Sequence, residues 1–244
     1  MEKVIEVKNL KKIFNHSTVA VDDISFDVFE NQIFGLIGPN GSGKTTTQRI
    51  LTTLLQPTAG EIKYHNRILT PKYANDIRNQ IGYVPQGECL YEDLTVLENL
   101  YIFSKPYSIS KEKRQKNIEA LLQKLEIEER KNTLVKHLSG GLKKRASIAT
   151  ALVHEPKILF LDEVTMGLDP NARYHIWNLI KNLKKNTTIV LTTHYMDEAE
   201  DLCDKIAILS KGRILELASP KTVIEKYKVK NLNQVIGKII EEEK

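Results

Sequence analysis

Apolar and polar residues largely alternate near the start of the chain. The alternation covers Val4 to Val7 and Val19 to Phe29, which is typical of strands with one buried face. Two short runs, Glu61 to Tyr64 and Arg67 to Leu69, flank a polar turn and also favour strands. Together these segments predict an antiparallel β-subdomain near the N-terminus.

Other apolar runs are continuous, as expected of strands that are buried on both faces. They are Ile33 to Ile37, Ile81 to Val84, Lys157 to Asp162 and Thr188 to Leu191, and shorter strands are expected at Ile206 to Leu209 and Arg213 to Leu217. Apolar residues at helical spacing follow two of the runs, from Thr45 to Leu55 and after the helix start Asp169-Pro170. Buried strands that alternate with helices predict an α/β fold.

Helical patterns dominate residues 86–153. Thr95 and Glu98 form a capping box that opens a helix, and Ser110 begins a longer one. Ser139 is a good N-cap for a third helix, from Leu142 onward. Because these helices stand between two core strands, we expect an inserted α-helical subdomain.

The length of 244 residues suits one compact unit with such an insertion. We expect a single domain over 1–244, with an α/β core built from 1–85 and 154–219. The helical subdomain is 86–153, and 220–244 forms a C-terminal helical tail. Val235, Ile236, Ile239 and Ile240 give this tail an apolar side that docks on the core or on a partner.

Composition narrows the classes of function. No apolar run approaches the ~18 residues that span a bilayer, and Met1-Glu2-Lys3 begins no signal-peptide core, so we expect a protein kept in the cytosol. Cys89 and Cys203 have no metal-binding spacing and are interpreted as reduced thiols. The net charge is +5, but the lysines are scattered, so we expect no nucleic-acid partner.

One stretch carries a specific chemical signal. Gly38-Pro39-Asn40-Gly41-Ser42-Gly43-Lys44-Thr45 fits the phosphate-loop pattern G-x-x-x-x-G-K-[ST] between a predicted strand and a predicted helix. In such a loop, backbone N–H groups close around phosphate oxygens at a helix N-terminus. We assign these eight residues and the following Thr46 to nucleotide binding, with Lys44 on the phosphates and Thr45 on Mg²⁺.

Further candidate site residues lie at the ends of the other core strands. Asp162 and Glu163 follow one buried strand, where Asp162 is expected to hold Mg²⁺ and Glu163 to polarise an attacking water. His194 follows the next strand, and Gln86 follows Ile81 to Val84. Ser139 begins a helix whose first residues are glycines, which makes a second candidate phosphate site.

These residues, in this order, resemble the ATPase subunit of ABC transporters along almost the whole chain. The matching motifs are Walker A at Gly38 to Thr45, the Q-loop at Gln86, the signature Leu138-Ser139-Gly140-Gly141, Walker B at Ile158 to Asp162 with catalytic Glu163, the D-loop Gly167-Leu168-Asp169-Pro170, and the switch histidine His194. Phe14, which we expect in a loop between the first two strands, falls at the position of the adenine-stacking aromatic residue. Phe34 to Gly38, Leu51 to Leu55 and Ala59 to Glu61 look most like daunorubicin-resistance exporters, which pair with ABC-2 type permeases.

The resemblance departs at three positions. Leu142 replaces the usual glutamine after the signature glycines, and Val164 and Met166 replace a proline and a small polar residue before the D-loop. The departures concern contacts within a dimer, because the residues expected to carry the chemistry are all present.

The resemblance implies a P-loop NTPase core and a head-to-tail dimer, of identical or different subunits. Ser139, Gly140 and Gly141 of one subunit would complete the ATP site of the other. Lys44, Glu163 and His194 would be catalytic, with Mg²⁺ held by Thr45, Gln86 and Asp162. ATP and Mg²⁺ are thus the expected cofactors.

The implied partner is an ABC-2 type permease in a separate chain, with this subunit on the cytoplasmic face of the membrane. DNA-repair ATPases carry the same signature but separate Walker A from Walker B by long coiled coils, and translation-factor proteins carry two cassettes. A soluble ATPase of iron–sulfur cluster assembly stays open as the alternative, because it too is a single short cassette.

Overall fold

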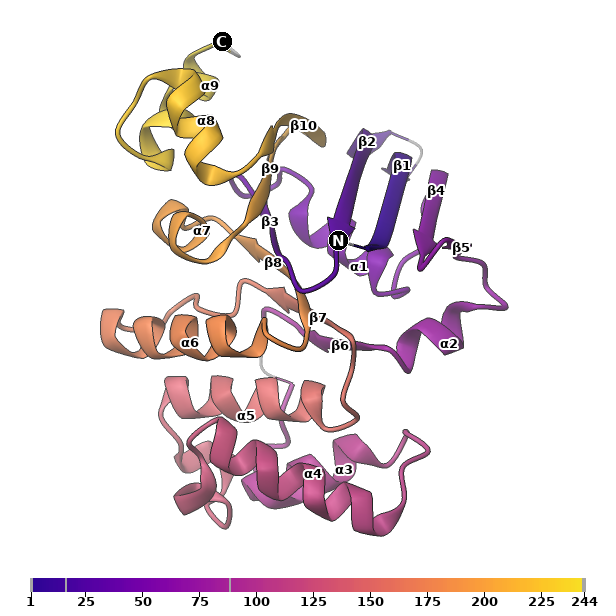
Figure 1. Ribbon diagram of the computed structural model, residues 1–244, viewed down its shortest axis with the longest axis vertical. Coiled ribbons are helices and arrows are strands. Elements are labelled where there is room, and N and C mark those ends of the chain that lie inside the picture. Colours follow the sequence, from indigo (N-terminus) through magenta and orange to yellow (C-terminus); the bar gives the residue numbers. More distant parts are fainter. Residues whose placement is uncertain (1, 16, 88, 243–244) are drawn as a thin grey trace.

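The computed structural model describes residues 2–15, 17–87 and 89–242 of the chain (Figure 1). A four-stranded antiparallel sheet, in the order β2-β1-β4-β5, forms the predicted N-terminal β-subdomain. Its strands are β1 (Lys3–Phe14), β2 (Thr18–Phe29), β4 (Ala59–Tyr64) and β5 (Arg67–Ile68). In Figure 1 this sheet lies at one side of the molecule, next to helix α1 (Lys44–Leu51).

The first strand is longer than the apolar alternation predicts, and it includes Phe14, which the pattern had placed in a loop. The register of β1 shifts between Val7 and Leu10, where Asn9 has a φ of 47°. Such a bulge interrupts the alternation of buried side chains while the backbone pairing continues. The prediction of a loop at Phe14 is therefore wrong, and Phe14 is the last residue of the strand.

A six-stranded sheet forms the centre, in the order β10-β9-β3-β8-β7-β6. Its strands are β3 (Ile33–Ile37), β6 (Ile81–Val84), β7 (Ile158–Asp162), β8 (Thr188–Thr193), β9 (Lys205–Ser210) and β10 (Arg213–Ala218). All pairs are parallel except β9 with β10 at one edge. Every residue of β3, β7 and β8 is buried, which explains the continuous apolar runs.

The two faces of the central sheet meet different partners. Phe34 and Leu36 of β3 pack in a cluster with the β-subdomain and α1. Ile33 and Ile37 of the same strand point into a larger cluster shared with the later helices. The period-two alternation of one strand thus places the sheet between two hydrophobic cores.

Three helices stand in the chain between β6 and β7, as predicted. They are α3 (Val96–Ser104), α4 (Lys111–Lys124) and α5 (Gly140–Leu152), with 3-10 turns at Glu128–Arg130 and Val135–His137. The Thr95 capping box forms, and the hydroxyls of Ser110 and Ser139 accept from backbone N–H groups at the starts of α4 and α5. In Figure 1 these helices lie together beyond edge strand β6.

The remaining helices are α2 (Ala74–Arg78), α6 (Pro170–Leu183), α7 (Met196–Leu202), α8 (Pro220–Tyr227) and α9 (Leu232–Glu242). Helix α2 contacts β6, α6 lies between α5 and α7, and α8 and α9 lie at the end of the molecule where α8 contacts β10 (Figure 1). The tail docks on the core of its own chain, because Leu232, Val235 and Ile239 are buried and the backbone N–H of Leu232 donates to Glu200 of α7 at 2.9 Å. Among the described residues, no helix is both long and apolar enough to cross a bilayer.

Candidate functional site

The candidate residues come from four neighbouring strands of the central sheet. In spatial order, β3 leads into the glycine loop (Gly38 to Thr45), β8 into His194, β7 into Asp162 and Glu163, and β6 toward Gln86. These strands are parallel, so their carboxyl ends share one edge of the sheet. Segments far apart in the sequence therefore converge on one site.

The glycine loop is held at both ends and open in the middle. A Cβ on Gly38 would lie 2.2 Å from the backbone oxygen of Leu209, and one on Gly43 would lie 2.5 Å from that of Ala20. Gly41 has a φ of 79° and no atom within 4 Å of the place of a Cβ. The buried hydroxyl of Ser42 has no hydrogen-bond partner among the described residues. An open backbone turn with a free buried donor, at the start of α1, fits a phosphate group.

Lys44 is buried at the first position of α1 and folds over its own loop. Its Nζ donates to the carbonyl oxygens of Gly38, at 2.8 Å, and Pro39, at 3.0 Å, and lies 3.7 Å from Oε1 of Glu163. Burial lowers the pKa of Lys44, and the nearby Glu163 carboxylate opposes that shift. The lysine therefore places a positive charge between the loop and the predicted catalytic acid.

The carboxylate of Asp162 accepts hydrogen bonds from three hydroxyl groups. Its Oδ1 accepts from Thr192 at 2.6 Å and from Thr45 at 3.1 Å, and its Oδ2 accepts from Tyr83 at 3.4 Å. Burial, with a contribution from Asp162, raises the pKa of Tyr83 to about 12, so the phenol stays protonated as a donor.

Two of the three predicted Mg²⁺ ligands thus lie together, Thr45 and Asp162. The described residues contain no cluster of three or more His, Cys, Asp or Glu able to hold a metal. A hydroxyl and a single carboxylate fit Mg²⁺, which keeps several waters and is usually held by one or two carboxylates and substrate phosphates. The third predicted ligand, Gln86, lies instead against Glu163.

Glu163 is 7% exposed and is held in place from several sides. Its φ is 46°, and its N–H donates to both the carbonyl and the hydroxyl oxygen of Thr192, each at 3.1 Å. Its Oε2 accepts from Nε2 of Gln86 at 3.1 Å and lies 3.3 Å from Nδ1 of His194, without hydrogen-bond geometry to that nitrogen. A left-handed conformation outside glycine is sustained only by such surrounding contacts.

The predicted signature residues lie away from the glycine loop. Ser139 caps α5, and Cβ atoms on Gly140 and Gly141 would lie 3.3 Å from Leu168 and Ala172. Within the described residues, no hydrogen bond joins Ser139, Gly140 or Gly141 to residues 38–46. The first turn of α5 therefore faces the loop before α6 and the first turn of α6, and the chain presents two separate helix starts.

Phe14 lies on the same side of the β-subdomain as the glycine loop. Its neighbour Ile13 pairs with Val19, next to Ala20, whose carbonyl lies against Gly43. The Phe14 ring is 37% exposed, and the ammonium of Lys12 lies 5.2 Å from its centroid. The ring is therefore available for stacking.

Sequence reasoning missed Thr192, Tyr83 and Glu198. Thr192 contacts both acids, Tyr83 contacts Asp162, and Glu198 binds Thr165 in the loop after Glu163. Thr192 and Tyr83 lie near the ends of core strands, and this position could have marked both as candidate site residues. Glu198 has acidic neighbours on both sides, and nothing in the pattern marks it as buried.

Comparisons with known proteins agree with this geometry. The family model for ABC transporters matches residues 21–166. The Nod factor export ATP-binding protein I of Paraburkholderia xenovorans is 40% identical over 224 residues, which are 91% of this chain and 73% of that protein. A solved ATP-binding subunit of an ABC transporter has a TM-score of 0.85 at 28% identity, covering 97% of this chain and 99% of its own. The structure of cbiO1 from Clostridium perfringens, part of the ABC transporter complex cbiONQ, has a TM-score of 0.86 at 28% identity and covers 93% of both chains.

Proposed function

The chain belongs to the ABC transporter family of ATP-binding ATPases, and we propose that it powers a separate ABC-2 type permease in export. One observation carries the proposal. The glycine loop, Glu163, His194 and Gln86 meet at one edge of a sheet in a chain whose relatives are named as export ATP-binding proteins. The similarity to export proteins favours transport over the soluble iron–sulfur assembly alternative.

The proposed chemistry divides the work among the residues at the edge. Glu163 accepts a hydrogen bond from the attacking water and orients it, while Lys44 and the loop N–H groups stabilise charge on the phosphates. His194, beside Glu163, contacts the terminal phosphate. Thr45 and Asp162 hold Mg²⁺, which supplies further charge neutralisation when bound.

We also propose that two subunits, identical or different, complete the sites. Because Ser139 to Gly141 lie away from residues 38–46, they are free to cap the nucleotide of a second subunit by the N-terminus of α5. Gln86 connects β6 to the helical segment 86–153, so its bond to Glu163 provides a path from the site to that segment. Closure of the dimer would then move 86–153 relative to the core.

A groove offers a place for the permease. It has a volume of about 370 Å³ and lies between the core and the helices, lined by Leu54, Cys89, Phe103 and Tyr107, among others. Leu54 is 62% exposed and lines the groove together with Phe103 and Tyr107, so a partner seated there would bury contiguous apolar surface. A cytoplasmic helix of a permease seated here would place this subunit on the cytoplasmic face of the membrane.

Co-purification tests the proposal. A tagged Glu163→Gln variant is recovered from detergent-solubilised native membranes with ATP present, and a variant that also carries Leu54→Glu serves as the matched control. The expected result is a multi-span permease at equal stoichiometry, lost in the control. Recovery only from the soluble fraction, with a soluble scaffold, would overturn the transport function in favour of the iron–sulfur alternative.

A further inference from the structure

A buried carboxylate outside the proposed site joins the two loops that form it. Glu198, in α7, is 2% exposed. Its Oε1 accepts from the hydroxyl of Thr165 at 2.8 Å and from the indole Nε1 of Trp177 at 3.0 Å. These donors come from the loop after β7 and from α6, so one oxygen atom ties three segments together.

Thr165 anchors the loop that carries the predicted catalytic acid. It follows Glu163 by two residues and is fully buried. The loop is folded on itself, because Met166 N donates to the carbonyl of Glu163 and Leu168 N to that of Thr165. A hydrogen bond to the Thr165 side chain therefore fixes the whole segment from Glu163 to the start of α6.

Glu198 lies in the helix that directly follows the other loop of the site. Helix α7 begins at Met196, two residues after His194, and Tyr195 N is fixed by the hydroxyl of Thr193. His194 in turn lies 3.3 Å from Glu163. Glu163 and His194 are thus connected in two ways, by their direct approach and by a path through Thr165, Glu198 and the first turn of α7.

The chemistry of Glu198 suits a fixed acceptor. Burial raises its pKa, while hydrogen bonds from Thr193, Thr165 and Trp177 act in the opposite direction. A buried carboxyl group without donors is costly, and an apolar side chain of the same size would fill the space without that cost. What the carboxyl group adds is direction, because it accepts hydrogen bonds only from donors at defined places.

We propose that Glu198 is a positioning residue for ATP hydrolysis, which sets the separation of Glu163 and His194 by binding Thr165 from the helix that follows His194. The inference rests on the proposed role of those two residues. It assigns to Glu198 no contact with nucleotide, so its removal should affect turnover and leave binding intact.

Three variants test the proposal. Glu198→Met keeps the approximate length of the side chain and removes the acceptor, whereas Glu198→Gln keeps an oxygen that Thr165 and Trp177 can still reach. Asp197→Asn is the matched control, because Asp197 is an exposed neighbour on the same helix, 3.5 Å from Arg173. The steady-state kcat, the ATP dissociation constant and the melting temperature are measured for each.

Misplacement of a catalytic group by about 1 Å costs up to about 100-fold in rate, so Glu198→Met should lower kcat by about 10- to 100-fold. The ATP dissociation constant should stay within about twofold of the wild-type value, since Glu198 touches no part of the glycine loop. Glu198→Gln and Asp197→Asn should keep kcat within about threefold. Trp177 is the only tryptophan, so its emission reports whether the surroundings of position 198 stay folded.

Two results would overturn the proposal. One is a Glu198→Met protein that is folded and turns over ATP at the wild-type rate. The other is a loss of kcat that merely follows the unfolded fraction and disappears well below the melting temperature. Failure of the proposed function looks different, because the wild-type protein itself would then show no turnover dependent on Glu163.

Discussion

The side-chain amide of Gln86 donates a hydrogen bond to the carboxylate of Glu163, with 3.1 Å between Nε2 and Oε2. The two residues follow neighbouring strands, β6 and β7. Gln86 also stands at the start of the helical segment, so a shift of that segment would pull on the acid proposed to orient water.

This contact predicts that Gln86→Ala lowers kcat by about tenfold, because Glu163 loses one of the groups that orient it. ATP affinity in the absence of turnover should change by less than about twofold, since Lys44 and the glycine loop are untouched. Steady-state turnover measures kcat, and equilibrium binding measures the ATP dissociation constant. Gln80→Ala is the control, because the side chain of Gln80 donates to the nearby backbone carbonyl of Asp76 and not to Glu163. Equal kcat values for the two variants would contradict the coupling.

The glycine loop predicts different results at two of its glycines. Gly41→Ala places a methyl group in the open part of the loop, at a φ of 79°. It should cost about 1–2 kcal/mol of stability and weaken ATP binding by at least tenfold. Gly38→Ala would collide with Leu209 and should fail to fold stably. Calorimetric titration and thermal unfolding distinguish the two effects.

Gly237 supplies the control for a change from glycine to alanine. It lies in α9 with no atom within 4 Å of the place of a Cβ. Gly237→Ala should stabilise the protein by about 0.5–1 kcal/mol, because alanine favours a helix. Binding of ATP to Gly41→Ala as tight as to Gly237→Ala would argue against the loop as the phosphate site.

A buried amide in α1 predicts a stabilising substitution. Gln48 is fully buried, and neither its Oε1 nor its Nε2 has a partner among the described residues. Gln48→Leu removes this desolvation cost at similar volume and should raise the unfolding free energy by about 1–2 kcal/mol. That corresponds to a rise in melting temperature of about 2–8 °C for a chain of this size. A lower melting temperature would mean that the amide is satisfied.

The sequence predicted the parts of the fold that local chemistry determines. Caps at Thr95, Ser110, Ser139 and Asp169 begin helices where expected, because a hydroxyl or carboxylate that binds N–H groups acts within four residues. Strands β9 and β10 were also predictable because a turn separates them, and the buried strands β3, β7 and β8 were predictable because both of their faces are apolar.

The parts that were missed depend on tertiary contacts. Helix α7 has no side-chain cap and only seven residues, so packing of Met196 and Ala199 on the core decides its conformation. Glu198 lies among exposed acids, and only the fold reveals that it is buried. The bulge at Asn9 likewise results from pairing with β2 rather than from a local signal.

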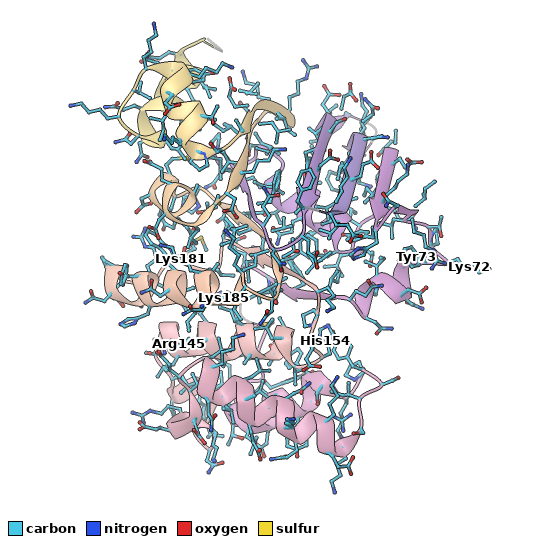
Figure 2. All side chains as sticks on the ribbon, viewed as in Figure 1. Lys72, Tyr73, Arg145, His154, Lys181 and Lys185 are labelled. Carbon is cyan, nitrogen blue, oxygen red and sulfur yellow. The ribbon has the colours of Figure 1, made fainter. Side chains whose placement is uncertain are left out.

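His154 predicts a pH dependence of stability. It lies just past the end of α5 (Figure 2), stacked on Tyr107 with 3.6 Å between ring centroids, and its Nε2 lies 3.0 Å from the carbonyl oxygen of Ile81. Burial lowers the pKa of His154 to about 4, whereas the unfolded chain takes up the proton near pH 6.5. Between these values the unfolded state binds more protons, so stability falls as pH drops from about 6.5 to 4.

Replacement of His154 by Gln keeps a donor for Ile81 and removes the titration. Between pH 7 and pH 5, the loss of unfolding free energy should be smaller than in the wild type by about 1–2 kcal/mol, a figure that allows for partial solvent screening. Urea unfolding at the two pH values measures the difference, with His175→Gln, an exposed histidine of α6, as control. An unchanged pH dependence in His154→Gln would place the effect elsewhere.

The central claim is that Glu163, held by Gln86 and beside Lys44 and His194, is the group that activates water for ATP hydrolysis. Phosphate release by the wild-type protein and by Glu163→Gln, at saturating ATP and Mg²⁺, tests it most directly. The wild type should turn over ATP, and the variant should bind ATP with similar affinity while its kcat falls by about 100-fold or more. A variant that hydrolyses ATP at the wild-type rate would contradict the assignment.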